Sequence, residues 1–217
     1  MSIKNIAFVD FDSTLLNGET FDLLAQEFKP NLIEETKQVN EKSVKGDIQL
    51  FDCILDRAQH FKGLHMNDFN RIFHKMKFND GAKDLVNYLQ TKDTKVVCLS
   101  GGFENVINHA QKVLGFDHYW ANHFQTDDNG YLTGNVSGPM MNENSKGIMV
   151  SRLQELFGFT PAQTIVIGDG SNDVSMFHHA DYRIAFCAAP ILKEKANIII
   201  EKPDLGLVIK HLEEMKF

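Results

Sequence analysis

The chain has 217 residues, of which 43% are hydrophobic and 24% are charged. This composition is ordinary for a globular protein, and it excludes disordered, collagen-like and fibrous classes. The length suits one domain, or one domain with a smaller insertion. With 22 Lys and Arg against 29 Asp and Glu, the net charge is −7. We therefore expect no nucleic-acid partner, because binding to nucleic acid depends largely on cationic side chains.

No apolar run approaches the ~18 residues that are needed to cross a bilayer. The apolar residues 6–9 are too few for a signal peptide, and they end at Asp10. We therefore expect a cytoplasmic protein with no membrane partner. Cys53, Cys98 and Cys187 are odd in number and far apart, which predicts small buried apolar side chains rather than disulfides.

Short runs rich in β-branched residues indicate strands that are buried on both faces. In chain order these runs are residues 6–9, 95–99, 164–167, 182–186 and 197–200. Amphipathic patterns between and after them indicate helices over residues 81–90, 104–114, 146–157 and 205–212. Strands that alternate with helices predict an α/β fold with a parallel, Rossmann-like sheet flanked by helices.

Two stretches depart from this alternation. Residues 16–79 contain no good strand but have helical spacing, which predicts a helical insertion into a core formed by residues 1–15 and 80–217. Residues 127–130 read Asp-Asp-Asn-Gly, a turn signal with strand-like residues on both sides. They predict a small β-hairpin over residues 123–137.

Acidic residues follow two of the predicted strands. Asp10 and Asp12 come directly after the first strand, and residues two apart in an extended segment point the same way. On their own they could equally start a turn or cap a helix. Asp169 and Asp173 follow the strand at 164–167, with Asn172 between them. Carboxylate oxygens suit a hard cation such as Mg²⁺, while the spacing matches neither a calcium loop nor a phosphate-binding P-loop.

Two further clusters suit an anion. Ser100 is followed by two glycines and a helix, which predicts a turn whose N–H groups cradle an anion, although an ordinary turn has the same pattern. Lys146 begins a predicted helix and by itself reads as a solvated lysine. Ligands bind at the carboxyl ends of strands in an open α/β sheet, so these groups should converge. Together they suit metal-assisted phosphoryl transfer.

The order of these clusters, from Asp10 through Ser100 and Lys146 to Asp173, resembles the haloacid dehalogenase (HAD) superfamily. Within it, the chain is similar to the phosphoserine phosphatase family. Ser13 points to this family, because most of the superfamily has glycine there. Residues 99–103 and 185–196 are also similar to the family nearly word for word.

The resemblance implies roles for the acids. Asp10 would attack phosphorus and form an aspartyl phosphate, which splits the reaction into two easier steps. Asp12 would protonate the leaving alkoxide and then accept a proton from water, which requires a pKa above the usual ~3.9. Mg²⁺ would be held by Asp10, the backbone carbonyl of Asp12, and Asp169.

The same resemblance implies the phosphate and substrate contacts. Ser100, Gly101 and Lys146 would bind the phosphoryl oxygens, Asp173 would orient Lys146, and Asn172 would position the phosphorylated group. In the insertion, Glu19 matches the family's substrate-binding Glu, and Arg57 matches its Arg by the distance from Gly46.

Glu19 and Arg57 suit the ammonium and carboxylate of L-phosphoserine, the expected small phosphorylated substrate. Glu19 could instead be a first-turn helix acid, and Arg57 could form a surface ion pair with Asp52 or Asp56. Outside these matches residues 30–78 differ from the family, with Leu50 in place of a usual aromatic residue.

Other functions remain to be separated by experiment. They are a phosphatase for another small phosphate ester, a phosphotransferase to a second alcohol such as homoserine, and a non-catalytic sensor of phosphorylated ligands. A dinucleotide enzyme is set aside because no G-x-G-x-x-G follows the first strand. The sequence predicts no particular oligomeric state.

Overall fold

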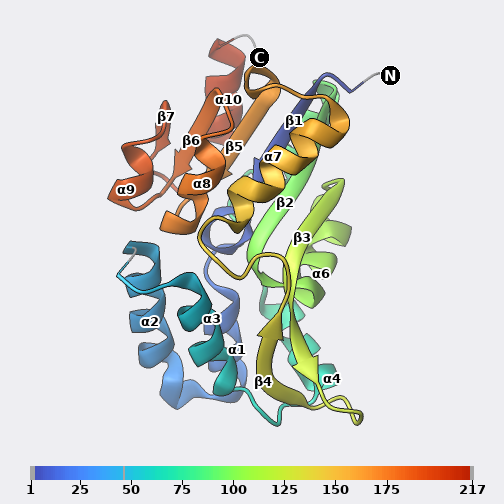
Figure 1. Cartoon of the computed structure of the whole chain (residues 1–217), viewed down its shortest axis with the longest axis vertical. Coiled ribbons are helices and arrows are strands. Elements are labelled where there is room, and N and C mark those ends of the chain that lie inside the picture. The colour runs from blue at the N-terminus through green and yellow to red at the C-terminus, as the bar shows by residue number, and fades with distance from the viewer. Residues whose placement is uncertain (1–2, 46, 216–217) are drawn as a thin grey trace.

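The computed structural model describes residues 3–45 and 47–215, so Gly46 lies outside the described residues. A seven-stranded sheet in the order β4-β3-β2-β1-β5-β6-β7 carries helices on both faces (Figure 1). The strands are β1 (Asn5–Val9), β2 (Thr94–Phe103), β3 (His118–Thr126), β4 (Leu132–Ser137), β5 (Thr164–Gly168), β6 (Tyr182–Phe186) and β7 (Ile198–Ile200). The helices are α1 (Thr20–Phe28), α2 (Ile33–Lys45), α3 (Leu50–Gln59), α4 (Met66–Phe69), α5 (Ala82–Thr91), α6 (Glu104–Leu114), α7 (Ser145–Phe157), α8 (Val174–Phe177), α9 (Pro190–Lys193) and α10 (Gly206–Glu214).

The α/β fold expected from the sequence is confirmed. All five predicted strands are present and are joined by parallel pairing. In β1, Ala7 and Val9 pack into the core on one face of the sheet, while Ile6 and Phe8 pack into the core on the other. Helices α5, α6 and α10 contribute to the first core, and α7, α8 and α9 to the second. This two-sided burial explains the continuous apolar runs.

The end of β2 differs from the prediction. The strand was expected to stop at Leu99, but it continues through Ser100 to Phe103. Its pairing with β3 is irregular between Leu99 and Phe103, so the two glycines lie in a distorted strand end. Helix α6 then begins at Glu104 without an intervening turn.

The turn at residues 127–130 joins β3 and β4 in antiparallel pairing. Strand β3 begins at His118, earlier than the predicted hairpin, and also pairs in parallel with β2. The hairpin therefore extends the main sheet at one edge.

The described residues of the segment 16–79 form α1 to α4 with short 3₁₀ turns. In Figure 1 helices α1, α2 and α3 lie below β1, β5 and β6, and α3 packs against β4. The chain leaves and returns at one place, where Asn17 N–H donates to the Lys77 carbonyl at 2.8 Å. Farther along, Gln59 Nε2 donates to the Gly134 carbonyl of β4 at 3.0 Å. The first bond joins the two ends of the helical segment, and the second holds the segment to the sheet.

The cysteines are all free, but they do not share one environment. Cys53 and Cys98 are buried as expected, whereas Cys187 is exposed. The prediction of burial was wrong for Cys187, because it lies beyond the carboxyl end of β6 in the loop before α9, where its side chain reaches the surface.

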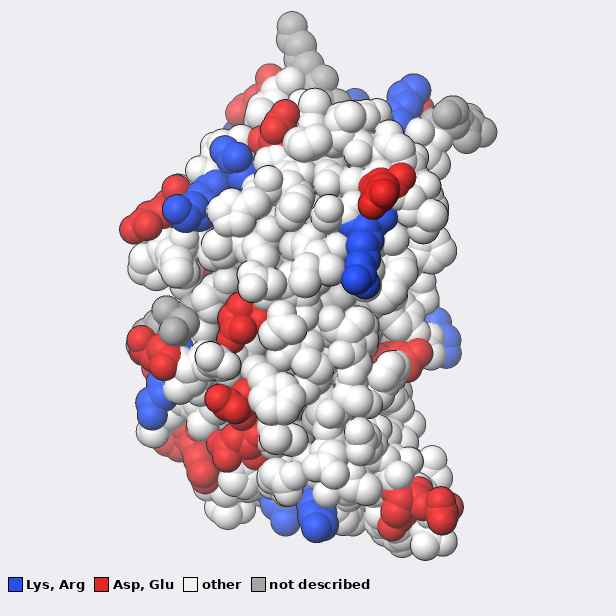
Figure 2. Space-filling view, in the orientation of Figure 1, with Lys and Arg blue, Asp and Glu red and all other residues white. Residues whose placement is uncertain are grey.

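The surface follows the overall composition. None of the described helices combines the length and apolar character needed to cross a membrane. On the face drawn in Figure 2, acidic side chains gather at the lower left, over α2 and α3. Asp47, Asp52 and Asp56 are exposed in this part of the chain. Lys and Arg side chains are scattered over this face among the described residues.

Candidate active site

A cavity of about 60 Å³ lies where the carboxyl ends of β1, β2 and β5 meet α1, α2 and α3. That volume has room for roughly four water molecules. The predicted site residues that line it are Asp10, Asp12, Glu19, Arg57, Gly101, Asp169 and Asn172. Three others, Ser100, Lys146 and Asp173, are buried outside the lining. We call this cavity the pocket.

Lys146 is fixed between two carboxylates. Its Nζ donates to Asp10 Oδ1 and, at 2.5 Å, to Asp173 Oδ1. The exposed fractions of Asp10, Lys146 and Asp173 are only 4%, 2% and 0%. Charge-assisted hydrogen bonds of this kind are among the stronger ones in proteins. Lys146 is therefore no solvated lysine, and it holds the Asp10 carboxylate at the pocket.

Asp173 also shapes the loop after β5. Its Oδ2 accepts the N–H groups of Asp169 at 2.9 Å and Gly170 at 3.0 Å. A Cβ on Gly168 would lie 2.3 Å from Asp173 Oδ2, so only glycine allows this approach. The loop thereby places Asp169 beside Asp10.

Asp12 lies at the N-terminus of α1. Its Oδ1 accepts two hydrogen bonds from Thr20, one from the backbone N–H and one from Oγ1, each at 2.7 Å. A carboxylate is stabilised at a helix N-terminus by the unpaired N–H groups and the helix dipole. The sequence analysis did not single out Thr20, although a hydroxyl residue beside Glu19, a possible first-turn helix acid, could have marked it.

Glu19 is held by the turn after β1. Ser13 has a φ of 57°, a left-handed conformation that costs most residues ~1–2 kcal/mol. Its Oγ donates to Glu19 Oε1 at 2.5 Å. Glu19 is the residue that precedes α1, yet its side chain makes no capping hydrogen bond. The geometry therefore favours a role in the pocket over the alternative of a helix-stabilising acid.

Arg57 is buried with an exposed fraction of 5%, which contradicts the alternative of a surface ion pair. Its Nη1 donates to Asn40 Oδ1 at 3.1 Å, and its Nε to the Cys53 carbonyl at 3.4 Å. The guanidinium carbon lies 4.4 Å from the centre of the Phe21 ring, a cation–π distance. Within residues 3–45 and 47–215, no carboxylate forms an ion pair with it. No sequence motif marked Asn40 or Phe21.

The cradle expected after β2 is formed differently. Ser100 is fully buried, and its Oγ accepts the N–H of Gly102 at 2.9 Å. Gly101 lines the pocket. A Cβ on Gly102 would lie 2.8 Å from Asp12 Oδ2. The distorted strand end, rather than a helix N-terminus, therefore brings this backbone to the pocket.

Burial raises the pKa of the acids around the pocket. Desolvation raises the pKa of Asp10 to about 7 against the opposing effect of Lys146. It raises the pKa of Glu19 to about 8, with the charge of Asp12 adding to the effect. The pKa of Asp169 is raised well above its usual range by burial and then by Asp10. These carboxyls repel one another when ionised, which favours a bound cation.

Asp12 and Lys146 also have shifted pKa values. Burial raises the pKa of Asp12, and the two hydrogen bonds from Thr20 partly offset this. For Lys146, burial lowers the pKa, but Asp10 and Asp173 outweigh it and raise the value. Lys146 therefore stays charged, while Asp12 is better able to carry a proton than an exposed aspartate.

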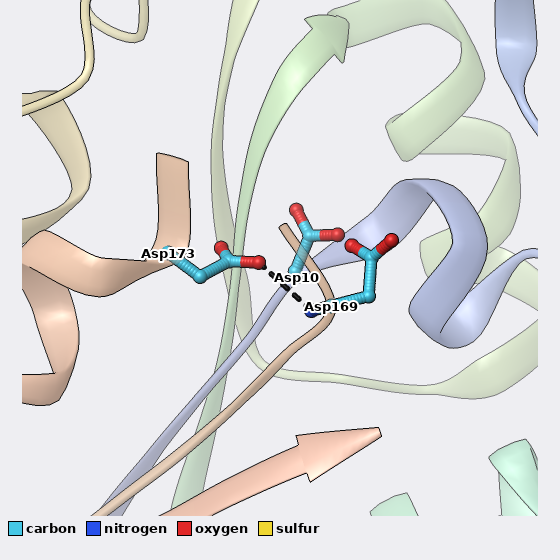
Figure 3. Close-up of side chains that lie close together, drawn as sticks. All are labelled: Asp10, Asp169 and Asp173. Carbon is cyan, nitrogen blue, oxygen red and sulfur yellow. Dashed lines mark hydrogen bonds between the residues drawn. The ribbon is translucent and has the colours of Figure 1, made fainter. Parts of the chain in front are cut away.

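The donor set fits a divalent cation. One oxygen each of Asp10, Asp169 and Asp173 lies within 4.8 Å of the others (Figure 3). Asp173 already bonds Lys146 with one oxygen and two N–H groups with the other, so Asp10 and Asp169 are the carboxylates left for a metal. Oxygen donors of this kind suit hard cations.

The sequence matches a protein family that is already described. A family model of haloacid dehalogenase-like hydrolases matches residues 4–181. The chain therefore belongs to the haloacid dehalogenase-like hydrolases.

Closer relatives narrow the class. A phosphoserine phosphatase of Wolinella succinogenes is 42% identical over 95% of this chain and 99% of its own length. A solved phospho-aspartyl intermediate analogue of phosphoserine phosphatase aligns with a TM-score of 0.90 at 36% identity, over 96% of this chain and 98% of that one. A substrate-bound phosphoserine phosphatase complex also aligns with a TM-score of 0.90, at 35% identity over 97% and 99% of the two chains. Within the hydrolases, the chain belongs to the phosphoserine phosphatase family.

Proposed function

We propose that the chain is a Mg²⁺-dependent phosphoserine phosphatase, which converts O-phospho-L-serine and water to L-serine and phosphate. The observation that carries the proposal is the pocket, where a Lys-bound aspartate lies together with a glutamate and a buried arginine that forms no ion pair within the described part of the chain. The substrate-bound and phospho-aspartyl relatives support it. We expect the enzyme to act in the cytoplasm.

Asp10 is the proposed nucleophile. Its Oδ1 accepts the Lys146 bond, which leaves Oδ2 for attack on phosphorus. An Asp10–phosphorus bond forms as the bond from phosphorus to the serine oxygen breaks. Water then attacks the phosphorus of the aspartyl phosphate, which frees Asp10 and releases phosphate. Lys146 offsets negative charge throughout, and Asp173 keeps it in place.

Asp12 is the proposed general acid and base. Because Thr20 occupies Oδ1, Oδ2 is the oxygen that can carry the proton. It gives this proton to the departing serine oxygen and later accepts one from the attacking water. The raised pKa of Asp12 supports both steps near neutral pH.

The remaining contacts hold the phosphate and a cation. Asp10, Asp169 and the backbone carbonyl of Asp12 would hold Mg²⁺, which when bound stabilises negative charge on the phosphoryl oxygens. Ser100, Gly101 and Lys146 would bind those oxygens. Asn172, which lines the pocket, would position the phosphorylated group.

Recognition of the amino acid is assigned to residues 16–79, which we propose act as a cap over the core of residues 1–15 and 80–217. Glu19 would bind the substrate ammonium. Arg57 would bind the carboxylate, for which a guanidinium offers paired donors. A cap that closes over the pocket would keep bulk water from the aspartyl phosphate until the intended step.

A substrate panel tests the proposal. The purified protein would be assayed with Mg²⁺ against O-phospho-L-serine, other small phosphate esters, and each ester with added homoserine. We expect kcat/KM to be at least about tenfold higher for phosphoserine, phosphate release that does not depend on homoserine, and loss of activity with a chelator. Preference for another ester would reject the substrate, and homoserine-dependent release would indicate a phosphotransferase. No turnover of any ester would indicate a sensor.

A further inference from the structure

The arginine of the pocket is oriented by side chains from two other helices and by a backbone carbonyl of its own helix. Arg57 lies on α3, Phe21 on α1 and Asn40 on α2. The guanidinium carbon lies over the Phe21 ring, while the Cys53 carbonyl and Asn40 Oδ1 accept hydrogen bonds from its Nε and Nη1. Since Nη1 can only donate, the Asn40 atom that it meets is the amide oxygen. Asn40 also lines the pocket beside Arg57.

Every described group that orients Arg57 is neutral. The ring face makes a cation–π contact, and the backbone carbonyl and the amide oxygen accept hydrogen bonds from the guanidinium. None of these groups cancels its charge. Asp12, Glu19 and Asp22 act on the Arg57 charge at longer range, but no described carboxylate lies within ion-pair distance of it. The guanidinium can therefore still pair directly with a ligand that brings a negative group. A carboxylate at position 40 would supply that negative group from the protein itself.

We propose that Asn40 is a specificity-determining residue, which orients Arg57 while leaving its charge available to the carboxylate of the substrate. Asn40 thereby sets the preference for phosphoserine over an otherwise similar ester that lacks the carboxylate. The inference rests on the proposed function, in which Arg57 binds that carboxylate. O-phosphoethanolamine is the matching probe, because it keeps the phosphate and the ammonium and lacks only the carboxylate.

Asn40→Asp is the decisive variant, since it keeps the size of the side chain and adds a charge. We expect kcat/KM for phosphoserine to fall by about 30-fold, mainly through KM, because the new carboxylate pairs with Arg57 and takes its charge away from the substrate carboxylate. For O-phosphoethanolamine we expect a change of less than about threefold, because nothing in this ester needs Arg57. Asn40→Ala removes the orienting oxygen without adding charge, and should lower kcat/KM for phosphoserine by about fivefold.

Two controls separate this role from a structural one. Asn31→Asp makes the same chemical change at an exposed position of the turn before α2, and should change neither ester by more than about twofold. In an Arg57→Ala background, Asn40→Asp should cause no further loss for phosphoserine, because its effect acts through Arg57. Thermal unfolding of each variant shows that it is folded.

The outcomes are distinct. If Arg57→Ala abolishes the preference for phosphoserine and both Asn40 variants keep it, the inference is overturned and the proposed function stands. If Asn40→Asp weakens both esters equally, Asn40 has a general structural role and the inference is overturned. If the wild-type protein does not prefer phosphoserine over O-phosphoethanolamine, the proposed recognition by Arg57 fails, and the inference fails with it.

Discussion

The two sides of the pocket are built in different ways. The floor comprises Asp10, Asp12 and Asp169, which line the pocket, and Lys146 and Asp173, which are buried behind them. These residues come from the segments that follow β1 and β5 and from the start of α7. The central members of the floor bond one another, with Lys146 joined to two carboxylates. The roof, consisting of Glu19, Asn40 and Arg57, comes from the residue before α1 and from α2 and α3. Its charged groups are held by neutral partners.

This difference assigns the chemical steps to the floor and the choice of substrate to the roof. Groups that are already bonded in the floor are in place for any phosphate ester, as preorganised electrostatic stabilisation requires. Glu19 and Arg57 in the roof form no ion pair among the described residues, so a substrate with an ammonium and a carboxylate can pair with each of them directly. Changes in the floor should therefore not depend on whether the ester carries an ammonium and a carboxylate, and changes in the roof should affect phosphoserine most.

The largest effect is expected for Asp10→Asn. The amide keeps the shape of the side chain but cannot attack phosphorus, so kcat should fall at least about 10⁴-fold for phosphoserine and for p-nitrophenyl phosphate. Steady-state assays with both esters measure this, and thermal unfolding verifies the fold. Activity within tenfold of the wild type would exclude Asp10 as the nucleophile.

The next largest effect is expected for Asp12→Asn. Loss of the proton donor should lower kcat for phosphoserine by about 10²–10⁴-fold, because an alkoxide is a poor leaving group. p-Nitrophenolate leaves without a proton, so for that ester only the hydrolysis of the aspartyl phosphate should be slow. A burst of one p-nitrophenolate per enzyme in rapid-mixing experiments would reveal this. Equal losses for both esters without a burst would contradict the proposed role.

Asp173→Asn tests the bonding of the floor. The amide cannot accept from both Lys146 and the N–H groups of the loop, so one side of this buried network is lost. We expect the free energy of unfolding to fall by about 3 kcal/mol. Displacement of Lys146 should lower kcat/KM about 100-fold for both esters. Urea unfolding and steady-state assays measure these effects, with Asp128→Asn on the exposed hairpin turn as the matched control. An unchanged stability would contradict the account of the floor.

Ser13→Gly affects the roof alone. Without the hydroxyl, Glu19 loses its bond, and KM for phosphoserine should rise about fivefold. Stability should change by less than about 1 kcal/mol, because relief of the left-handed strain offsets the lost bond and the more flexible unfolded chain. Ser13→Ala should give the same KM but lower stability, since it keeps the strain. A fall in kcat for p-nitrophenyl phosphate in either variant would place Ser13 in the floor instead.

The smallest effect concerns the pH dependence of stability. The carboxyl of Glu19 titrates near 4.5 when unfolded and has its pKa raised to about 8 in the folded chain, chiefly by burial. Between these values the folded state binds more protons, so the metal-free protein should lose stability as the pH rises. Glu19→Gln should lose less stability over this range. Melting temperatures from pH 5 to pH 8.5 test this, and identical slopes for the two proteins would contradict it.

The floor was predictable from the sequence because its acids directly follow strand-forming runs. Asp10 and Asp169 each come at or just after the end of a buried strand, and parallel strands bring such ends together. The end of β2 was less predictable, because a Ser-Gly-Gly run usually ends a strand, whereas here it continues as a distorted strand paired with β3.

The roof was predictable only where a family resemblance marked it. Asn40 and Arg57 are 17 positions apart on different helices, so only the packing of α2 against α3 brings them together. Phe21 shares this property, since its ring faces Arg57 from α1. The local sequence pattern carries no information about such contacts, which is why Asn40 and Phe21 were missed.

The most direct test of the division between floor and roof is the ratio of kcat/KM for O-phospho-L-serine to kcat/KM for p-nitrophenyl phosphate. It would be measured in the wild type, Arg57→Ala and Asp173→Asn. We predict that Arg57→Ala lowers this ratio by about 100-fold, as expected when a buried charge partner is removed, and that Asp173→Asn leaves it within about threefold. A ratio that is unchanged in Arg57→Ala, or that falls equally in both variants, would contradict the division.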